Sequence, residues 1–125
     1  MLIVVEVGDW EHECCGSAFE RDSVIEITCL VVPAHDDHPV RYVESHHDLG
    51  PARDPGRERD TIEVRGRVAD LHIEHPDGST EQIDRLPSGR ALRGFDDRDE
   101  GHLERPWTGA PVTNDSNRYL LTIAT

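Results

Sequence analysis

Apolar and polar residues alternate along several stretches of the sequence, and the alternation repeats every two residues, as in a β-strand with one buried face. The clearest stretches are residues 2–7, 23–32, 61–75 and 118–124. They are rich in valine and isoleucine, whose branched side chains favour extended backbone. No stretch of convincing length has the apolar spacing of an amphipathic helix. The pattern therefore predicts a mostly β protein.

The alternation also separates the two faces of each predicted strand. The apolar faces that it produces are Ile3, Val5 and Val7; Ile25, Ile27, Cys29 and Val31; and Tyr119, Leu121 and Ile123. Opposite the second set lie Glu26 and Thr28, which favour water, so we expect the second set to face the core. Cys29 is then a small core residue, as free cysteines often are.

Residues 61–75 form the longest predicted strand, and the phase of their pattern changes along its length. The apolar residues up to Val68 keep one phase, and those from Leu71 onward keep the opposite one. A strand changes phase only where it contains an extra residue, so we predict a β-bulge near residues 69–70. Gly66 marks a point where the strand can curve sharply.

The connections between the strands suggest how they are arranged. Residues 76–79 are a turn sequence that leads back into a short strand near residues 80–83. A closing strand such as 118–124 commonly pairs with an early strand. Short strands, a sharp bend and long loops predict a small antiparallel barrel or rolled sheet, either OB-like (oligonucleotide/oligosaccharide-binding-like) or SH3-like.

The composition adds a single domain and mobile loops to this picture. A chain of 125 residues fits one domain, and we assign residues 1–125 to it. Hydrophobic residues make up 35% and charged residues 31%, so the core is modest. Segments near 48–60 and 94–117 have too little apolar content to offset the entropy of ordering, and we expect them to be mobile.

The charge of the chain restricts the partners that it can have. There are 26 acidic residues against 13 basic ones, giving a net charge of −13. Such a chain repels nucleic acid and anionic membranes, so both are disfavoured as partners. No window is apolar enough to span a bilayer, and the run at residues 2–7 meets Glu6 too early for a signal peptide. We therefore expect a cytoplasmic protein.

Candidate chemistry is concentrated in one early stretch and one pair of histidines. The candidate binding residues are Trp10, Cys14, Cys15, Phe19, His46 and His47. Zinc prefers thiolate and imidazole ligands, so the two cysteines and the two histidines are the candidate metal ligands. Adjacent strand residues point to opposite faces, so one of the two thiols reaches a shared metal more easily than the other. Glu13 or Glu44 is a candidate further ligand. The alternative is one buried thiol and one thiol in a turn.

Catalysis and aromatic stacking are less favoured uses of the same residues. A nucleophilic thiol requires a lowered pKa, whereas Glu11 and Glu13 stabilise the protonated thiol, so we predict no catalytic residue. The chain contains few aromatic residues, and we expect most of them to pack in the core. A platform for ligand stacking on Trp10 or Trp107 is the alternative.

The run from Trp10 to Phe19, together with the entry into the next strand at Val24, resembles a family of uncharacterised actinobacterial proteins. The shared pattern is a Trp, a Cys-Cys-Gly, a Phe three positions on and a Gly-Asp-x-Val that enters a strand. Arg21 stands here in place of that glycine. The weaker matches are at residues 46–47 and 66–68. The resemblance implies a domain of unknown function and no catalytic activity.

These observations favour a small soluble binding or interaction module built on a β-barrel, without an assigned cofactor. One alternative is a zinc-binding protein that uses Cys14 or Cys15 together with His46 or His47. Another is a structural homodimer that forms through an exposed strand edge.

Overall fold

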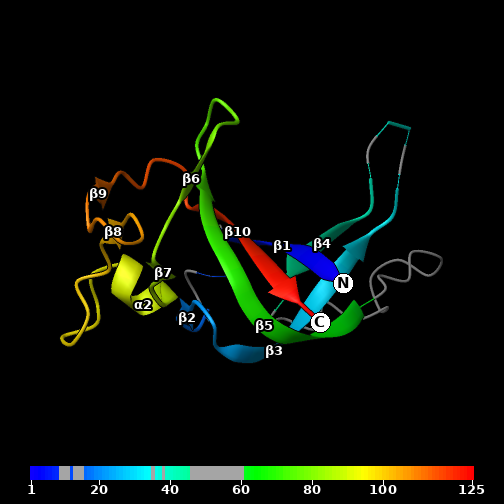
Figure 1. Ribbon diagram of the computed structural model, residues 1–125, viewed down its shortest axis with the longest axis horizontal. Coiled ribbons are helices and arrows are strands. Elements are labelled where there is room, and N and C mark those ends of the chain that lie inside the picture. The colour runs from blue at the N-terminus through cyan, green and yellow to red at the C-terminus, as the bar shows by residue number, and fades with distance from the viewer. Residues whose placement is uncertain (9–11, 13–15, 35, 38, 46–60) are drawn as a thin grey trace.

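The computed structural model describes residues 1–8, 12, 16–34, 36–37, 39–45 and 61–125 of the chain, and Figure 1 shows their arrangement. The predicted loop at 48–60 lies outside these residues.

Five strands form a closed barrel. They are β1 (Leu2–Gly8), β3 (Val24–Val32), β4 (Arg41–Glu44), β5 (Thr61–Glu74) and β10 (Arg118–Ala124). Their order is β10-β1-β4-β3-β5, and β10 pairs again with β5, which closes the ring. The β1–β4 pair is parallel and the other four pairs are antiparallel. The predicted mostly-β class and small barrel are thus confirmed.

The apolar faces of these strands fill the interior of the barrel. Side chains with no exposed surface include Val5, Cys29, Val68, Leu71, Ile73, Leu121 and Ile123. Ile3 and Ile25, nearer the strand ends, are partly buried and pack against the same core. Burying each large apolar side chain contributes about 1.5–3 kcal/mol before the entropy of ordering is counted. The predicted faces and the predicted core position of Cys29 are confirmed.

The predicted β-bulge lies in β5 at Ala69. Thr122 of β10 pairs with Asp70, but the next residue, Ile123, pairs with Val68, so Ala69 has no partner in the ladder. One extra residue reverses the faces of the strand from that point. Both halves of β5 therefore direct their apolar side chains into the barrel.

Gly66 lies where β5 changes its neighbouring strand. From Arg67 onward β5 pairs with β10, whereas up to that residue it pairs with β3. A β-carbon at Gly66 would lie 2.3 Å from the carbonyl oxygen of Ala124. The close approach of β10 requires a residue without a side chain here.

The strands pair as in an OB barrel, but their order along the chain is circularly permuted. Counted as β5, β10, β1, β3 and β4, the first three strands are neighbours in order, and the third and fifth form the parallel pair. This is the arrangement of the five-stranded OB barrel. The permutation is possible because the chain ends meet: the Thr125 N–H donates to the Met1 carbonyl at 2.9 Å. Of the two predicted barrel classes, the OB-like one fits this pattern.

Except for β6, the smaller elements lie beside the barrel, on the left of Figure 1. They are β2 (Phe19–Glu20), which pairs with β7 (Arg85–Leu86); α2 (Gly89–Leu92); and β8 (Leu103–Glu104), which pairs with β9 (Pro111–Val112). Strand β6 (Thr80–Gln82) pairs with β5 and completes the predicted hairpin. The segment at 94–117 therefore contains a small β-hairpin, and its mobility stays a prediction.

Trp107 differs from the expectation that the aromatic residues pack in the core. It lies in the β8–β9 connection and is 87% exposed, whereas Phe19 is 6% exposed. Its φ is +64°, which is uncommon for a bulky residue. The core interpretation is thus wrong for Trp107 and correct for Phe19.

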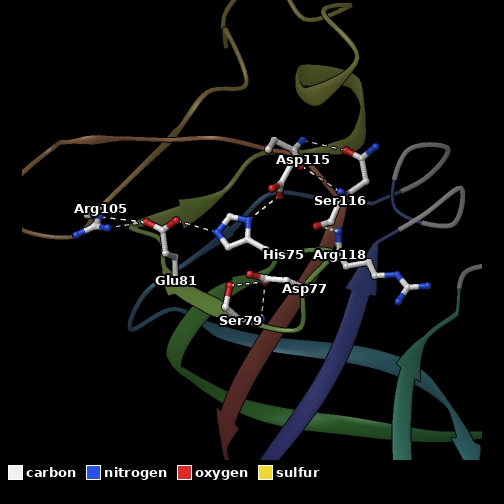
Figure 2. A network of polar contacts seen from close by, with 10 residues as sticks. His75, Asp77, Ser79, Glu81, Arg105, Asp115, Ser116 and Arg118 are labelled. Carbon is white, nitrogen blue, oxygen red and sulfur yellow. Dashed lines mark hydrogen bonds and ion pairs between the residues drawn. The ribbon is translucent and has the colours of Figure 1, made fainter.

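A histidine fastens the end of the β5–β6 hairpin to the chain before β10 (Figure 2). His75 Nδ1 lies 2.6 Å from Asp115 Oδ1, and Nε2 lies 2.8 Å from Glu81 Oε1. Glu81 also accepts from Arg105 at 2.9 Å. Carboxylates only accept, so the ring donates from both nitrogens and carries a positive charge. We name His75, Glu81 and Asp115 the histidine clamp.

The strand edge expected to support a homodimer is largely used within the barrel. In the described chain, each of the five barrel strands has neighbours on both sides along part of its length. The homodimer stays a prediction that the mass of the protein in solution can test.

Candidate metal centre

Two polar side chains are fully buried in an otherwise apolar interior. Among the described residues, His12 (1% exposed) and Glu44 (2% exposed) are the buried polar or charged ones. Glu44 ends β4 and pairs with Cys29, whereas His12 precedes β2 in the chain. Buried charges require a partner. We name this pair the His12–Glu44 junction.

The hydrogen bonds of His12 determine which ring nitrogen carries a proton. Nε2 lies 2.9 Å from the carbonyl oxygen of Pro87. A carbonyl only accepts, so Nε2 must be the donor. Nδ1 then faces Glu44 Oε1 at 3.4 Å. The two atoms form an ion pair when Nδ1 carries a proton, and they are two electron-pair donors that a metal ion can bridge when it does not.

Two aromatic rings hold the imidazole in place. Phe19 stacks on it with a centroid separation of 6.2 Å, and Tyr119 meets it edge-on at 6.1 Å. Both side chains are buried in the core cluster. The ring of His12 is therefore positioned by packing as well as by its hydrogen bond.

Gly16 leaves the room that the imidazole occupies. A β-carbon there would lie 2.0 Å from Nδ1 of His12. The Gly16 N–H donates to the His12 carbonyl at 2.9 Å, and the Gly16 carbonyl accepts from the Gly89 N–H at 3.1 Å. Gly16 is thus required because any larger residue would collide with the ring of His12.

Cys29, the thiol among the described residues, is buried and pairs with Glu44 in the sheet register. Burial, and secondly the negative charge of Glu44, raise the pKa of Cys29 to about 12. A thiol with such a pKa is protonated at neutral pH and is a poor nucleophile and metal ligand. The role of Cys29 is therefore to pack in the core.

The geometry of the junction fits one edge of a zinc tetrahedron. Zinc–nitrogen and zinc–oxygen bonds of about 2.0–2.2 Å place two ligand atoms of a tetrahedron roughly 3.3–3.6 Å apart. Nδ1 of His12 and Oε1 of Glu44 are 3.4 Å apart. Histidines that bind metals commonly donate their other N–H to a backbone carbonyl, as His12 does to Pro87. Within the described part of the chain, no three potential ligand side chains converge.

DUF6578, a family of unknown function, matches residues 1–117. The chain belongs to the DUF6578 family. No curated protein and no solved structure matches it. The predicted resemblance to a family without an assigned function is confirmed, whereas the actinobacterial source and the predicted motif stay predictions. In the described residues of this DUF6578 protein, no helix has the length and apolar character needed to cross a bilayer.

Most of the predicted site residues of this DUF6578 protein lie outside the described residues. They are Trp10, Cys14, Cys15, His46 and His47. Phe19 is described, and it packs against His12. That a cysteine and a histidine of these pairs share a metal ion therefore stays a prediction.

Sequence reasoning missed His12 as a central residue. The sequence predicts Glu44 as a candidate further ligand, whereas His12 lies within the run from Trp10 to Phe19 and has no predicted role of its own. One signal in the sequence was available, namely Gly16 four residues after His12. Its role is visible only when the ring position is known.

Proposed function

We propose that the protein is a small β-barrel binding module that holds a zinc ion at the His12–Glu44 junction. The observation that carries the proposal is the 3.4 Å separation of Nδ1 and Oε1, with Nε2 used as a donor to Pro87. The buried position favours a cation that neutralises the carboxylate.

The predicted ligands are close to the junction along the chain. Cys14 follows His12 by two residues, and His46 follows Glu44 by two residues. Two residues span at most about 7 Å of extended chain. We infer that one thiolate from Cys14 or Cys15 and one imidazole from His46 or His47 complete a tetrahedron. Zinc with one thiolate and one carboxylate is electrically neutral, which suits a buried site.

The proposed role of the zinc is structural. A site with four protein ligands leaves no position for a substrate. The ion would join the end of β4 to the chain between β1 and β2, and His12 extends that link to Pro87 before α2. Binding to the folded state alone stabilises a protein by about 2.7 kcal/mol at a ligand concentration one hundred times Kd.

Elemental analysis of protein purified without chelators tests the proposal. We expect about one zinc per chain. Zinc below about a tenth of an equivalent, in protein that also fails to take up added zinc, overturns it. Glu44→Gln preserves the size of the side chain and removes its charge, and should lower zinc affinity at least about tenfold.

Cysteine variants provide the matched control. Cys14→Ser or Cys15→Ser should lower zinc affinity, whereas Cys29→Ala, which removes the buried and protonated thiol, should leave zinc content unchanged. Equal loss of zinc in all three variants would indicate general destabilisation and would contradict the assigned ligands.

A further inference from the structure

We propose that the face around Trp107 is a second binding site and that its ligand is a neutral saccharide. The residues that form it, which we name the Trp107 face, are Arg21, Glu81, Gln82, Arg105, Trp107 and Thr108. The proposal is independent of the zinc ion. It rests on an exposed aromatic ring, the contact that holds this ring and a hollow lined by the residues on either side of it in the chain.

The backbone presents Trp107 to solvent. The side chain is 87% exposed although tryptophan is among the largest apolar residues. Its φ of +64° is an outlier for a bulky residue. Outliers of this kind persist where the surrounding structure enforces them, and they are concentrated at functional sites.

Arg21 holds the ring from one side. Its guanidinium carbon lies 5.7 Å from the centroid of the Trp107 ring. Arg21 is itself fixed, because it pairs with Asp70 at 2.6 Å and donates to the carbonyl of Ile83 at 2.9 Å. A ring held in this way loses little freedom when a ligand stacks on it.

A hollow of mixed polar and apolar character is lined by the two residues that flank Trp107 in the chain. Its volume is about 300 Å³, and its lining includes Glu81, Gln82, Arg105, Pro106 and Thr108. Pro106 and Thr108 flank Trp107 in the chain. The volume is at the lower end of the range for small-molecule sites.

The polar groups of the hollow are connected to the support of the ring. The Gln82 amide donates to Asp70 Oδ2 at 3.2 Å, and Asp70 also binds Arg21. On the other side, Arg105 donates to Glu81 at 2.9 Å. The amide of Gln82, the carboxylate of Glu81 and the guanidinium of Arg105 are thus held in place before a ligand binds.

This combination suits a pyranose ring. A sugar presents an apolar C–H face, which packs on an aromatic ring, and an edge of hydroxyl groups, which pair with carboxylate, amide and guanidinium groups. The lining of the hollow combines apolar surface with carboxylate, amide and guanidinium groups, so a ligand with both an apolar face and polar groups fits it better than a purely apolar one. The net charge of −13 disfavours polyanions. A neutral saccharide satisfies both conditions.

Calorimetric titration with a panel of neutral oligosaccharides tests the assignment. The panel should cover chains of glucose, galactose, mannose, xylose and N-acetylglucosamine. We expect at least one of them to bind the full chain with a Kd of about 1 mM or lower. Trp107→Gly should weaken this binding at least about tenfold, and Trp107→Phe should retain part of it. Glycine suits a φ of +64°, so the first variant should fold normally.

Phe95→Ala is the matched control. Phe95 is 61% exposed and has an arginine, Arg93, 4.9 Å from its ring centroid, but it lies outside the Trp107 face. Its removal should leave the Kd unchanged. The assignment is overturned if no oligosaccharide binds at millimolar concentration, if Trp107→Gly binds normally, or if a proline-rich peptide binds this face in place of a saccharide.

Discussion

Gly16 and His12 show how one atom can control a buried site. The position that a side chain would occupy at residue 16 is already filled by the imidazole, 2.0 Å from Nδ1. Any β-carbon there must displace the ring. The displacement would disturb the contact with Glu44, the hydrogen bond to Pro87, or both.

We therefore expect Gly16→Ala to lower the free energy of unfolding by about 1–3 kcal/mol, the usual cost of overpacking a core. Zinc content, if zinc is present, should fall with it. Urea unfolding measures the first effect and elemental analysis the second. Ser17→Ala, at the exposed neighbouring position, is the control and should unfold like the wild type. Identical unfolding midpoints for Gly16→Ala and the wild type would contradict the close contact.

Individual residues were predictable from the sequence where burial follows alternation. Cys29 falls on the apolar face of its strand and is indeed buried. His12 and Trp107 could not be placed in this way, because neither lies in a predicted strand. Trp107 has a positive φ, and His12 occupies the room left by Gly16; alternation reports neither feature.

At the scale of elements, the histidine clamp connects two segments that are distant in the sequence. It links the β5–β6 hairpin to the chain before β10 (Figure 2). The hydrogen bond to Asp115, and secondly that to Glu81, raise the pKa of His75 above its ordinary value of 6.5. The folded state therefore binds the proton of His75 more tightly than the unfolded state does.

A raised pKa in the folded state gives the sign of the pH dependence. The stabilisation by the clamp is fully present below about pH 6.5 and is lost as the pH rises through the raised pKa of His75. We expect the wild type to exceed His75→Gln in stability near pH 6 and the difference to shrink toward pH 9. Urea unfolding across this range measures the difference.

His102→Gln is the control for the clamp. His102 is a more exposed histidine and contacts Glu104 at 2.6 Å in the β8–β9 region. This substitution leaves His75 and its two carboxylate partners in place. A stability difference for His75→Gln that stays constant with pH would contradict the charged clamp.

The long elements were predictable because each has one face in the core. The bulge in β5 was also predictable, since the apolar pattern reverses its phase and only an extra residue permits this. The short elements β2, β7, β8 and β9 were not. Each has two residues, too few for a period of two to be recognised.

At the scale of the whole molecule, the barrel order was not predictable from the sequence. Alternation identifies the strands but contains no information on which of them are neighbours. The parallel pairing of β1 with β4 occurs in a ring that the pairing of β5 with β10 closes, and these strands are distant from one another in the sequence. Predicting a barrel was possible; predicting its order was not.

The contact between the chain ends leads to a test of the barrel order. Joining Thr125 to Met1 by a short glycine-rich linker and starting the chain at Thr61 should give a folded protein with the same far-ultraviolet circular dichroism. The new sequence would run through the strands in the order of an OB barrel. A permutant opened between Ile27 and Thr28, inside β3, is the control and should not fold. If the first permutant does not fold, the described closure is contradicted.

The pairing of β1 also determines when the protein can fold during its synthesis. Strand β1 is made first, but its sheet partners are β4 and β10, and β10 (Arg118–Ala124) is made last. The seven-residue pairing of β1 with β10 can therefore form only after the other barrel strands have been translated. Pairing between such distant residues gives folding times of milliseconds to seconds rather than microseconds. The barrel is thus open, and its apolar faces are exposed to aggregation, until β10 has been made; the many negative charges help to keep the chain apart from other copies.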